Sequence, residues 1–233
     1  MWRAAWKGLT GHRLRFALTA LSIALGVGLV AASYMFTDSL DRAFDDLFSA
    51  TLSGFDIQVR PQVDENLAFT QGAPLPSELV EEIADLPGVD AARGSIFGFA
   101  QVSAGGESLS NGTSPTFVVS WPDLVDAFMV RSGDEPGAGE AALDPTAASR
   151  AGLSPGDEIV VTGVGAPQTL EFSGTAAIEG FESFGGAVSV YVTLETAQEL
   201  LDLENQVLTI EIETRQSLEA MIASVETILP EGV

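Results

Sequence analysis

The chain has 233 residues, of which 46% are hydrophobic, and it carries a formal net charge of −23 at pH 7. This acidity argues against nucleic-acid binding, because affinity for nucleic acid comes from cationic contacts with phosphate. The chain has no cysteine, which excludes a disulfide scaffold and thiolate metal sites, and it is long enough to bury a core without them.

The N-terminal segment combines positive charge with a long apolar run. The first 37 residues hold four cations and no acid, and all 33 acids lie at or after Asp38. Residues 16–36 contain no charged side chain. A helix of that length would extend roughly 31 Å at about 1.5 Å per residue, close to the roughly 30 Å hydrocarbon core of a bilayer. The run therefore predicts a transmembrane helix over residues 16–36.

The charges around this run predict its orientation. Cytoplasmic flanks of membrane helices carry an excess of Lys and Arg. The cytoplasmic or interfacial segment is therefore residues 1–15, and everything after the run is expected outside the cell. Trp2 and Trp6 share one face of a short helix at the headgroup level. The residues predicted to set the topology and to contact the membrane interface are Arg3, Lys7, Arg13, Arg15, Trp2 and Trp6.

Two other interpretations of the apolar run are weaker. A soluble core helix would need a polar face, which this run lacks. A cleaved signal peptide could end at Val30-Ala31-Ala32, but its apolar region would span only roughly 7–15 residues. The run also continues into an apolar helical stripe over residues 37–51, which predicts an uncleaved anchor and a stalk helix. The stalk residues predicted to pack on the outer domain or on a partner stalk are Leu40, Phe44, Leu47 and Phe48.

The outer domain is predicted to begin with a strand and a helix. Residues 55–60 alternate as a strand should. Pro76 and Ser77 are helix-start signals, and Pro87-Gly88 ends the helix before a strand predicted from Val89 to Val102. In a βαβ unit the helix covers one face of the sheet that its strands form. Residues 52–117 are therefore predicted to be the first βαβ half of the domain.

A β-rich stretch follows, predicted as a subdomain inserted over residues 118–186. One strand is predicted at 116–121. The segment GAGEAALDPTAASRAGLSPGDEIVVTG then predicts strand, short helix and strand, with Asp144-Pro145 starting the helix and Gly152 ending it. Further strands are predicted at 169–172 and 187–192, and Thr193 can cap the helix that follows.

The end of the chain resembles the first half. A strand is predicted at 207–213, Ser217 caps a helix, and Leu-Pro followed by Gly-Val ends it as before. Ile83 and Ile222 are expected to be buried at equivalent positions. Residues 187–233 are therefore the predicted second βαβ half. The repeat stops at Val233, where its next strand should begin, so we expect a fragment of a longer membrane protein. The predicted fold class is α+β, with a transmembrane helix and stalk before this domain.

The residue types that carry catalysis are scarce outside the predicted membrane span. The one histidine, His12, and the one lysine, Lys7, both precede the apolar run, which excludes a histidine triad or a lysine nucleophile outside. No phosphate-binding GxxxxGK[ST] motif occurs. The acids at 38, 41, 45 and 46 follow the spacing of a solvated helix face rather than of a calcium loop. We therefore predict a non-catalytic protein with no directly bound cofactor.

Two segments together resemble a known family. The run HRLRFALTALSIALGVGLV followed by a stalk, and then GEAALDPTAASRAGLSPGDEIVV, resembles the permease subunits of MacB/FtsX-type ABC transporters. Arg13 and Arg15 match the basic pair before the first membrane helix of that family. Gly139-Glu140, Leu143, Ala147 and Gly156-Asp157 match the pattern within its extracytoplasmic core domain.

This resemblance implies a function. Such a permease lies in the cell membrane with three further membrane helices after the core domain. A separate cytoplasmic domain or subunit hydrolyses ATP, and a second permease copy or a paralogue completes the transporter. Relatives act on lipoproteins, lipids, peptides or drugs, or regulate cell-wall hydrolases. The alternative is a membrane-anchored outer domain that binds a ligand or a protein and has no transport role.

Overall fold

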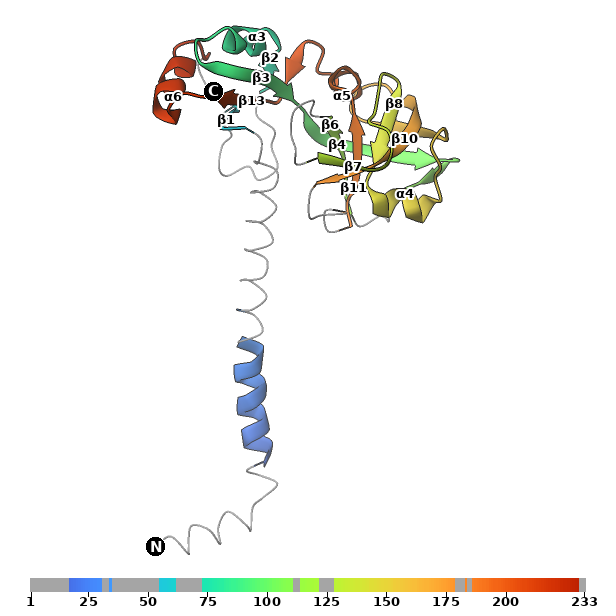
Figure 1. Cartoon of the computed structure of the whole chain (residues 1–233). Helices are drawn as coiled ribbons and strands as arrows, with labels where there is room; N and C mark the ends of the chain where they lie inside the picture. The colour runs from blue at the N-terminus through green and yellow to red at the C-terminus, as the bar shows by residue number, and fades with distance from the viewer. Residues whose placement is uncertain are drawn as a thin grey trace, which may run out of the picture. The chain divides into compact units, whose positions relative to one another are not determined.

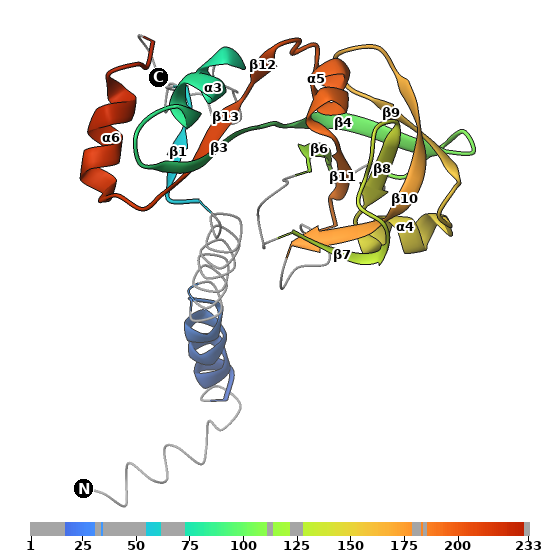
Figure 2. The ribbon, with the colours of Figure 1, turned by 45° about the horizontal axis from the view of Figure 1, so that its top comes forward.

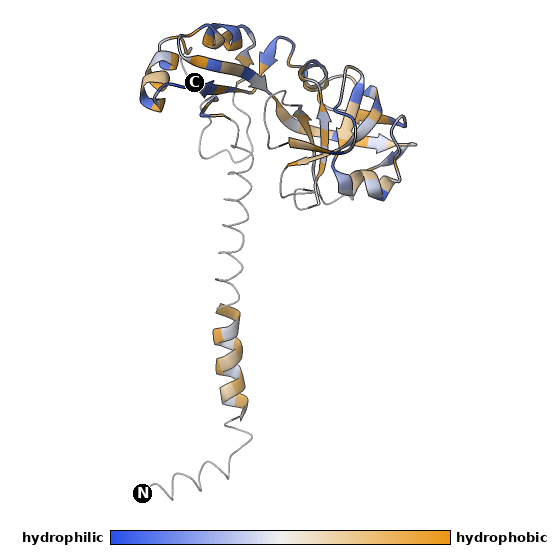
Figure 3. Ribbon diagram, viewed as in Figure 1, coloured by the Kyte–Doolittle hydropathy of each residue, from blue (hydrophilic) through white to orange (hydrophobic). Residues whose placement is uncertain are grey.

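The computed structural model describes residues 17–30, 34, 55–61, 73–110, 114–121, 128–178, 183 and 186–230. The chain divides into two compact units, Met1–Ser49 and Ala50–Val233. In the first unit, residues 17–30 form a helix. Its side chains are exposed, and none of them is strongly hydrophilic (Figure 3). Within the described residues, no helix combines the length and the apolar character needed to cross a membrane.

The second unit contains two lobes, of which the first is built on a three-stranded sheet (Figure 1). We call it the sheet lobe. Its strands follow the order β1-β13-β3, and every neighbouring pair is antiparallel. Both of its helices pack on the same face, because their buried residues share one core with Val59, Ile210 and Ile212. The elements of this lobe are β1 (Ile57–Val59), β2 (Leu75–Pro76), α3 (Glu78–Ala84), β3 (Val89–Ser95), β12 (Gln206–Val207), β13 (Thr209–Thr214) and α6 (Leu218–Glu226).

The second lobe is a β-barrel, seen from another side in Figure 2. Its strand order is β5-β4-β6-β11-β8-β10-β7, and β9 pairs with both β10 and β4, which closes the sheet. The barrel core is filled by aliphatic side chains and Phe172, with α5 contributing Leu200. The elements of this barrel lobe are β4 (Phe97–Ala104), β5 (Glu107–Ser108), β6 (Thr116–Ser120), β7 (Phe128–Gly133), β8 (Glu140–Leu143), α4 (Pro145–Ala151), β9 (Glu158–Thr162), β10 (Gln168–Ile178), β11 (Val188–Val192) and α5 (Leu194–Leu201).

The barrel lobe is inserted between β3 and β13 of the sheet lobe. The first half of the sheet lobe runs β1, α3, β3, and the second runs β13, α6. Strands β1 and β3 are both antiparallel to β13, so they are parallel to each other with β13 between them. The mixed helix-and-strand architecture predicted for the outer domain is confirmed.

The boundaries between the lobes differ from the predicted ones. The strand predicted from Val89 to Val102 is two strands, β3 and β4, which belong to different lobes and are separated only by Ile96. The predicted second half began at residue 187, but β11 and α5 belong to the barrel lobe. The barrel lobe thus extends from Phe97 to Leu201, beyond the predicted 118–186. An alternating pattern of side chains predicts a strand but does not show which other strand it pairs with. The boundaries between the two lobes were therefore misplaced in the prediction.

Of the two isoleucines expected to be buried, one is buried and the other is not. Ile83 is 0% exposed, as predicted, whereas Ile222 is 43% exposed, so the prediction for Ile222 is wrong. Met221 and Val225 face the core of the sheet lobe instead. The apolar stripe of α6 is therefore wider than the surface that the sheet covers.

Candidate functional site

The residues predicted to act as a site lie outside the described part of the chain. They are the topology and interface residues Arg3, Lys7, Arg13, Arg15, Trp2 and Trp6 and the stalk residues Leu40, Phe44, Leu47 and Phe48. The acids of the disfavoured calcium site also lie there. The described residues instead offer three surfaces on the outer domain, and none of the three was predicted as a site.

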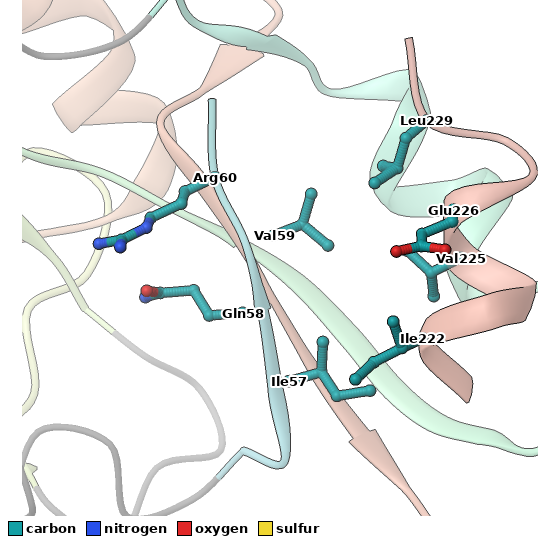
Figure 4. Close-up of a pocket in the computed structure, with 8 residues that line it drawn as sticks. All are labelled: Ile57, Gln58, Val59, Arg60, Ile222, Val225, Glu226 and Leu229. Carbon is teal, nitrogen blue, oxygen red and sulfur yellow. The ribbon is translucent and has the colours of Figure 1, made fainter. Parts of the chain in front are cut away.

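The first surface is an apolar groove between β1 and α6, with a cavity volume of about 280 Å³. Figure 4 shows Ile57 and Val59 of β1 pointing toward α6, while Gln58 and Arg60 point to the other side of the strand. The α6 side is lined by Ile222, Val225, Glu226 and, beyond the helix, Leu229. Alternation along the strand produces this division of polar and apolar side chains.

A mismatch in width explains the groove. Three strands about 4.8 Å apart span roughly 14 Å, whereas two helices side by side need about 20 Å. The sheet is therefore about one strand narrower than the layer of α3 and α6, and α6 overhangs the edge at β1. Within the described residues, β1 pairs only with β13. The groove thus combines an open strand edge with apolar side chains, a combination that can accept an extended segment.

The second surface is a charged cluster on the opposite face of the sheet. Arg93 of β3 pairs with Glu211 (Nε to Oε2, 3.3 Å) and with Glu213 (Nη2 to Oε1, 2.6 Å) on β13. The Ser95 hydroxyl donates to Glu211 Oε1 at 3.1 Å. Burial raises the pKa of Glu211 above its usual range, while the Ser95 hydroxyl and Arg93 lower it. The alternation TIEIET indicated that the two glutamates share a face, but not that Arg93 lies beside them.

The third surface is aromatic and lies on the outside of the barrel. Phe97 and Phe99 of β4 are 51% and 49% exposed. Their rings pack on Phe117 of β6, with centroids 4.8 and 5.3 Å away. A second group, Trp121, Phe128 and Tyr191, makes edge-to-face contacts in the same sheet but is not exposed in the same way, because Tyr191 is 1% exposed and the other two rings pack against it. Exposed aromatic rings are typical of protein contact surfaces.

The segment GEAALDPTAASRAGLSPGDEIVV has a structural role in the barrel lobe. Asp144, which is 1% exposed, caps α4 by accepting from the Ala147 N–H at 2.9 Å. Its second oxygen accepts from the Ser189 N–H of β11, also at 2.9 Å. Gly152 ends the helix in the left-handed conformation, at φ 66°. Asp157 accepts from the Ser154 N–H in the following turn. Asp144 therefore ties the N-terminus of α4 to β11, and Asp157 stabilises the turn after the helix.

Replacing Asp144 should destabilise the outer domain. Asp144→Ala removes a helix cap, which costs about 0.5–2 kcal/mol. It also leaves the buried Ser189 N–H without its acceptor, which costs about 1–3 kcal/mol. We expect a loss of about 2–4 kcal/mol in the free energy of unfolding, measured by urea denaturation. Asp157→Ala is the control, because it removes an exposed carboxylate of the same motif and should cost under about 1 kcal/mol. Equal losses in both variants would contradict the assigned role.

The three surfaces on the described residues share a character that suits contact with another molecule. The described residues contain no group of three or more His, Cys, Asp or Glu side chains arranged to hold a metal ion. The groove and the aromatic surface are apolar, and the charged cluster is paired internally. The groove and the exposed aromatic rings are suited to binding another polypeptide.

The comparison with known families decides what kind of protein this is. The sequence matches the family described as the MacB-like periplasmic core domain over residues 16–228, nearly the whole chain. The chain belongs to this family. The MacB-like family is a non-catalytic component of ABC-type transporter permeases, and membership implies a membrane protein with an extracytoplasmic domain. The resemblance predicted from the two segments is thus confirmed.

Solved structures support the same fold. One is the extracellular domain of the noncanonic ABC-type transporter YknZ from Gram-positive bacteria. It has 13% identity and a TM-score of 0.52, and the match covers 72% of this chain and 88% of that one. Another is the periplasmic region of MacB from Actinobacillus actinomycetemcomitans. It has 9% identity and a TM-score of 0.56, and the match covers 73% and 80% of the two chains. At these identities the likeness shows the fold alone. Among curated proteins, no sequence matches the chain.

Proposed function

We propose that this MacB-like chain is a permease subunit that couples ATP hydrolysis in the cytoplasm to movement of its extracytoplasmic domain. The observation that supports this most is the extent of the family match. It begins at residue 16 and ends at residue 228, so it includes the apolar run together with both lobes of the outer domain. The movement serves export of a substrate or mechanotransmission to a partner outside.

The proposed subunit crosses the membrane with residues 16–36 and has its N-terminus in the cytoplasm. The uncharged run is long enough for a bilayer, and the flanking cations lie on its N-terminal side. Residues 37–51 form the stalk, and the core domain lies outside the cell membrane. The structure describes residues 17–30 and 34 of the membrane segment but none of residues 1–15 or 37–51, so the support for the orientation and the stalk is the sequence.

The orientation can be tested with a reporter fused after Val233. In the unmodified chain the reporter should lie outside, because the cations favour the cytoplasm. Replacing Arg3, Lys7, Arg13 and Arg15 with Gln should impair or invert insertion. Arg42→Gln, which removes the cation just after the run, is the control and should leave the orientation unchanged. A cytoplasmic reporter in the unmodified chain would show that the orientation is wrong.

The proposed partners follow from the family. An ABC transporter component implies a cytoplasmic ATPase, and ATP binds there rather than to this chain. A second permease copy or a paralogue completes the membrane part. The transported molecule belongs to the lipoproteins, lipids, peptides or drugs. The groove at β1 and the aromatic surface of the barrel lobe are the described surfaces suited to apolar contact with a partner or substrate.

A second candidate function is a membrane-anchored binding domain without a transport role. The open groove and the exposed Phe97 and Phe99 favour it, since both surfaces suit protein contact. Purification from native membranes in mild detergent separates the two functions. Co-purification of an ATPase whose hydrolysis rate depends on this chain supports the permease. Purification of the chain at full yield with no ATP hydrolysis supports the binding domain.

A further inference from the structure

The two lobes of the outer domain are connected by two crossings of the chain. The outgoing crossing leads from β3 to β4, and the return crossing leads from α5 through β12 to β13. Lobes joined in this way move relative to each other by default, unless their contact is extensive and well packed. The structure of the crossings therefore decides whether the outer domain is hinged or rigid.

The outgoing crossing contains no free linker. Ile96 is the one residue between β3 and β4, and it is 1% exposed within the barrel core. Its N–H donates to Oγ of Ser120 at 2.9 Å. Its carbonyl oxygen accepts from the Ser120 N–H, also at 2.9 Å. Ser120 of β6 thus holds Ile96 on both sides, and the backbone cannot rotate there without breaking buried hydrogen bonds.

The chain on either side of Ile96 is held closely by its own lobe at a glycine, Gly94 of β3 against Val207 of β12 in the sheet lobe and Gly98 of β4 against Leu201 of α5 in the barrel lobe. A Cβ atom placed on Gly94 would lie 2.4 Å from Cγ1 of Val207, and one on Gly98 would lie 2.4 Å from Cδ1 of Leu201. Such distances are far below van der Waals contact, so a side chain on either glycine would force its neighbour, Val207 or Leu201, to move. The Leu208 N–H also donates to the Ser95 carbonyl oxygen at 3.0 Å. The two crossings therefore support each other on both sides of Ile96.

Helix α5 of the barrel lobe also bonds to the sheet lobe. Nε2 of Gln198 donates to the carbonyl oxygen of Gln206 at 2.9 Å and lies 3.3 Å from Oγ of Ser77. The Ser77 N–H donates to the Asn205 carbonyl oxygen at 2.9 Å. Leu194, at the start of α5, packs against the cores of both lobes. These contacts add to those at the two glycines and oppose rotation of one lobe against the other.

We propose that the sheet lobe and the barrel lobe are locked into one rigid body by this joint. Its parts are Gly94, Ile96 and Gly98 on the outgoing chain, Leu201 and Val207 on the return chain, and Gln198 as a positioning residue. When the sheet lobe moves, the barrel lobe and its aromatic surface then move with it by the same rigid-body displacement. The consequence for coupling rests on the proposed function, whereas the rigidity itself does not.

Distances between spin labels test the joint in the full chain, which has no native cysteine to interfere. The pair Glu82→Cys and Ser149→Cys reports across the lobes, from exposed positions on α3 and α4. The pair Ser149→Cys and Glu195→Cys reports within the barrel lobe. We expect the distance distribution across the lobes to be as narrow as the one within the barrel lobe. A broad or multiple distribution across the lobes, with a narrow one within the barrel lobe, would overturn the proposal.

Variants of the joint provide the second arm of the test. Gly94→Ala should broaden or shift only the distribution across the lobes, because Val207 is branched and fully buried and must be displaced. Adding Val207→Ala removes the clashing methyl groups and should restore the narrow distribution. Gln198→Glu replaces a donor with an acceptor facing the Gln206 carbonyl and should also broaden it. Gln168→Glu is the matched control, since Gln168 donates to Glu199 within the barrel lobe.

The outcomes separate the joint from the proposed function. Unchanged distributions in folded Gly94→Ala and Gln198→Glu variants would overturn the role of these residues. If either variant fails to fold, the unmodified joint still decides between a rigid and a hinged domain. No ATPase or transport is needed for the measurement, so a rigid joint without coupled activity would reject the permease function and leave the joint standing.

Discussion

Insertion of two glycines between Leu40 and Asp41 is expected to abolish coupled activity of the complete transporter. If an ATPase moves the outer domain through the membrane, the connection between membrane helix and domain must be stiff. The segment TDSLDRAFDDLFSATL contains no Gly or Pro and continues the apolar helical stripe of residues 16–36. Two glycines would weaken the predicted stalk helix and introduce a flexible joint that cannot pass on movement.

The readout is substrate transport or mechanotransmission by the full-length complex, measured together with its abundance in the membrane. Folding and insertion should be unchanged, because the insertion site lies between the membrane run and the outer domain. Insertion of two alanines at the same place is the control, because it adds the same length but is compatible with the predicted helix. Normal activity of the glycine variant at normal abundance would favour a passive tether and the binding-domain alternative.

Shortening side chains in the core of the sheet lobe should have the largest effect on stability. Ile83 and Met221 are both 0% exposed and lie in one core, so changing either to Ala should cost about 2–5 kcal/mol in the free energy of unfolding. Ile222 lies on the same helix as Met221 but is 43% exposed in the groove. Changing it to Ala should therefore lower the free energy of unfolding by about 1 kcal/mol or less. Glu82→Asp, at an exposed position of α3, should have almost no effect.

Urea denaturation of the four variants and the parent gives these free energies, provided that the slope with urea concentration stays constant. The comparison of Met221 with Ile222 is the informative one, since it tests the width mismatch between sheet and helices. A loss for Ile222→Ala as large as for Met221→Ala would mean that the groove is filled in solution. Small losses for all variants would mean that the face of the sheet lobe is misassigned.

Several features of this protein were predictable because they depend on neighbouring residues alone. The short helix α4 follows from Asp144-Pro145 at its start and Gly152 at its end, and the structure places it at Pro145–Ala151. Strands β8, β9 and β11 lie where alternation and turn residues predict them. Strand β7 was not predicted, because the FMVRSG segment has little alternation.

The candidate surfaces could be predicted only in part. The segment TIEIET indicated a strand with Glu211 and Glu213 on one face, yet nothing nearby in the sequence identifies Arg93 as their partner. Those residues are about 120 positions apart, and the antiparallel register of β3 with β13 brings them together. The pattern of apolar residues in α6 correctly predicted that one face of the helix is apolar. The prediction that the sheet covers all of this face was wrong, because Ile222 is exposed.

The sequence by itself determined the charge asymmetry, the uncharged run at residues 16–36, most local elements of the outer domain and, through two segments, the family. Only the tertiary structure decided that the strand expected from Val89 to Val102 is divided at Ile96 between two lobes. It also decided that β9 closes a barrel and that Ile222 is exposed. The physical reason is the range of the interactions involved. Capping, turns and side-chain alternation act over a few residues, whereas strand neighbours and the width of a sheet depend on segments brought together from distant parts of the chain.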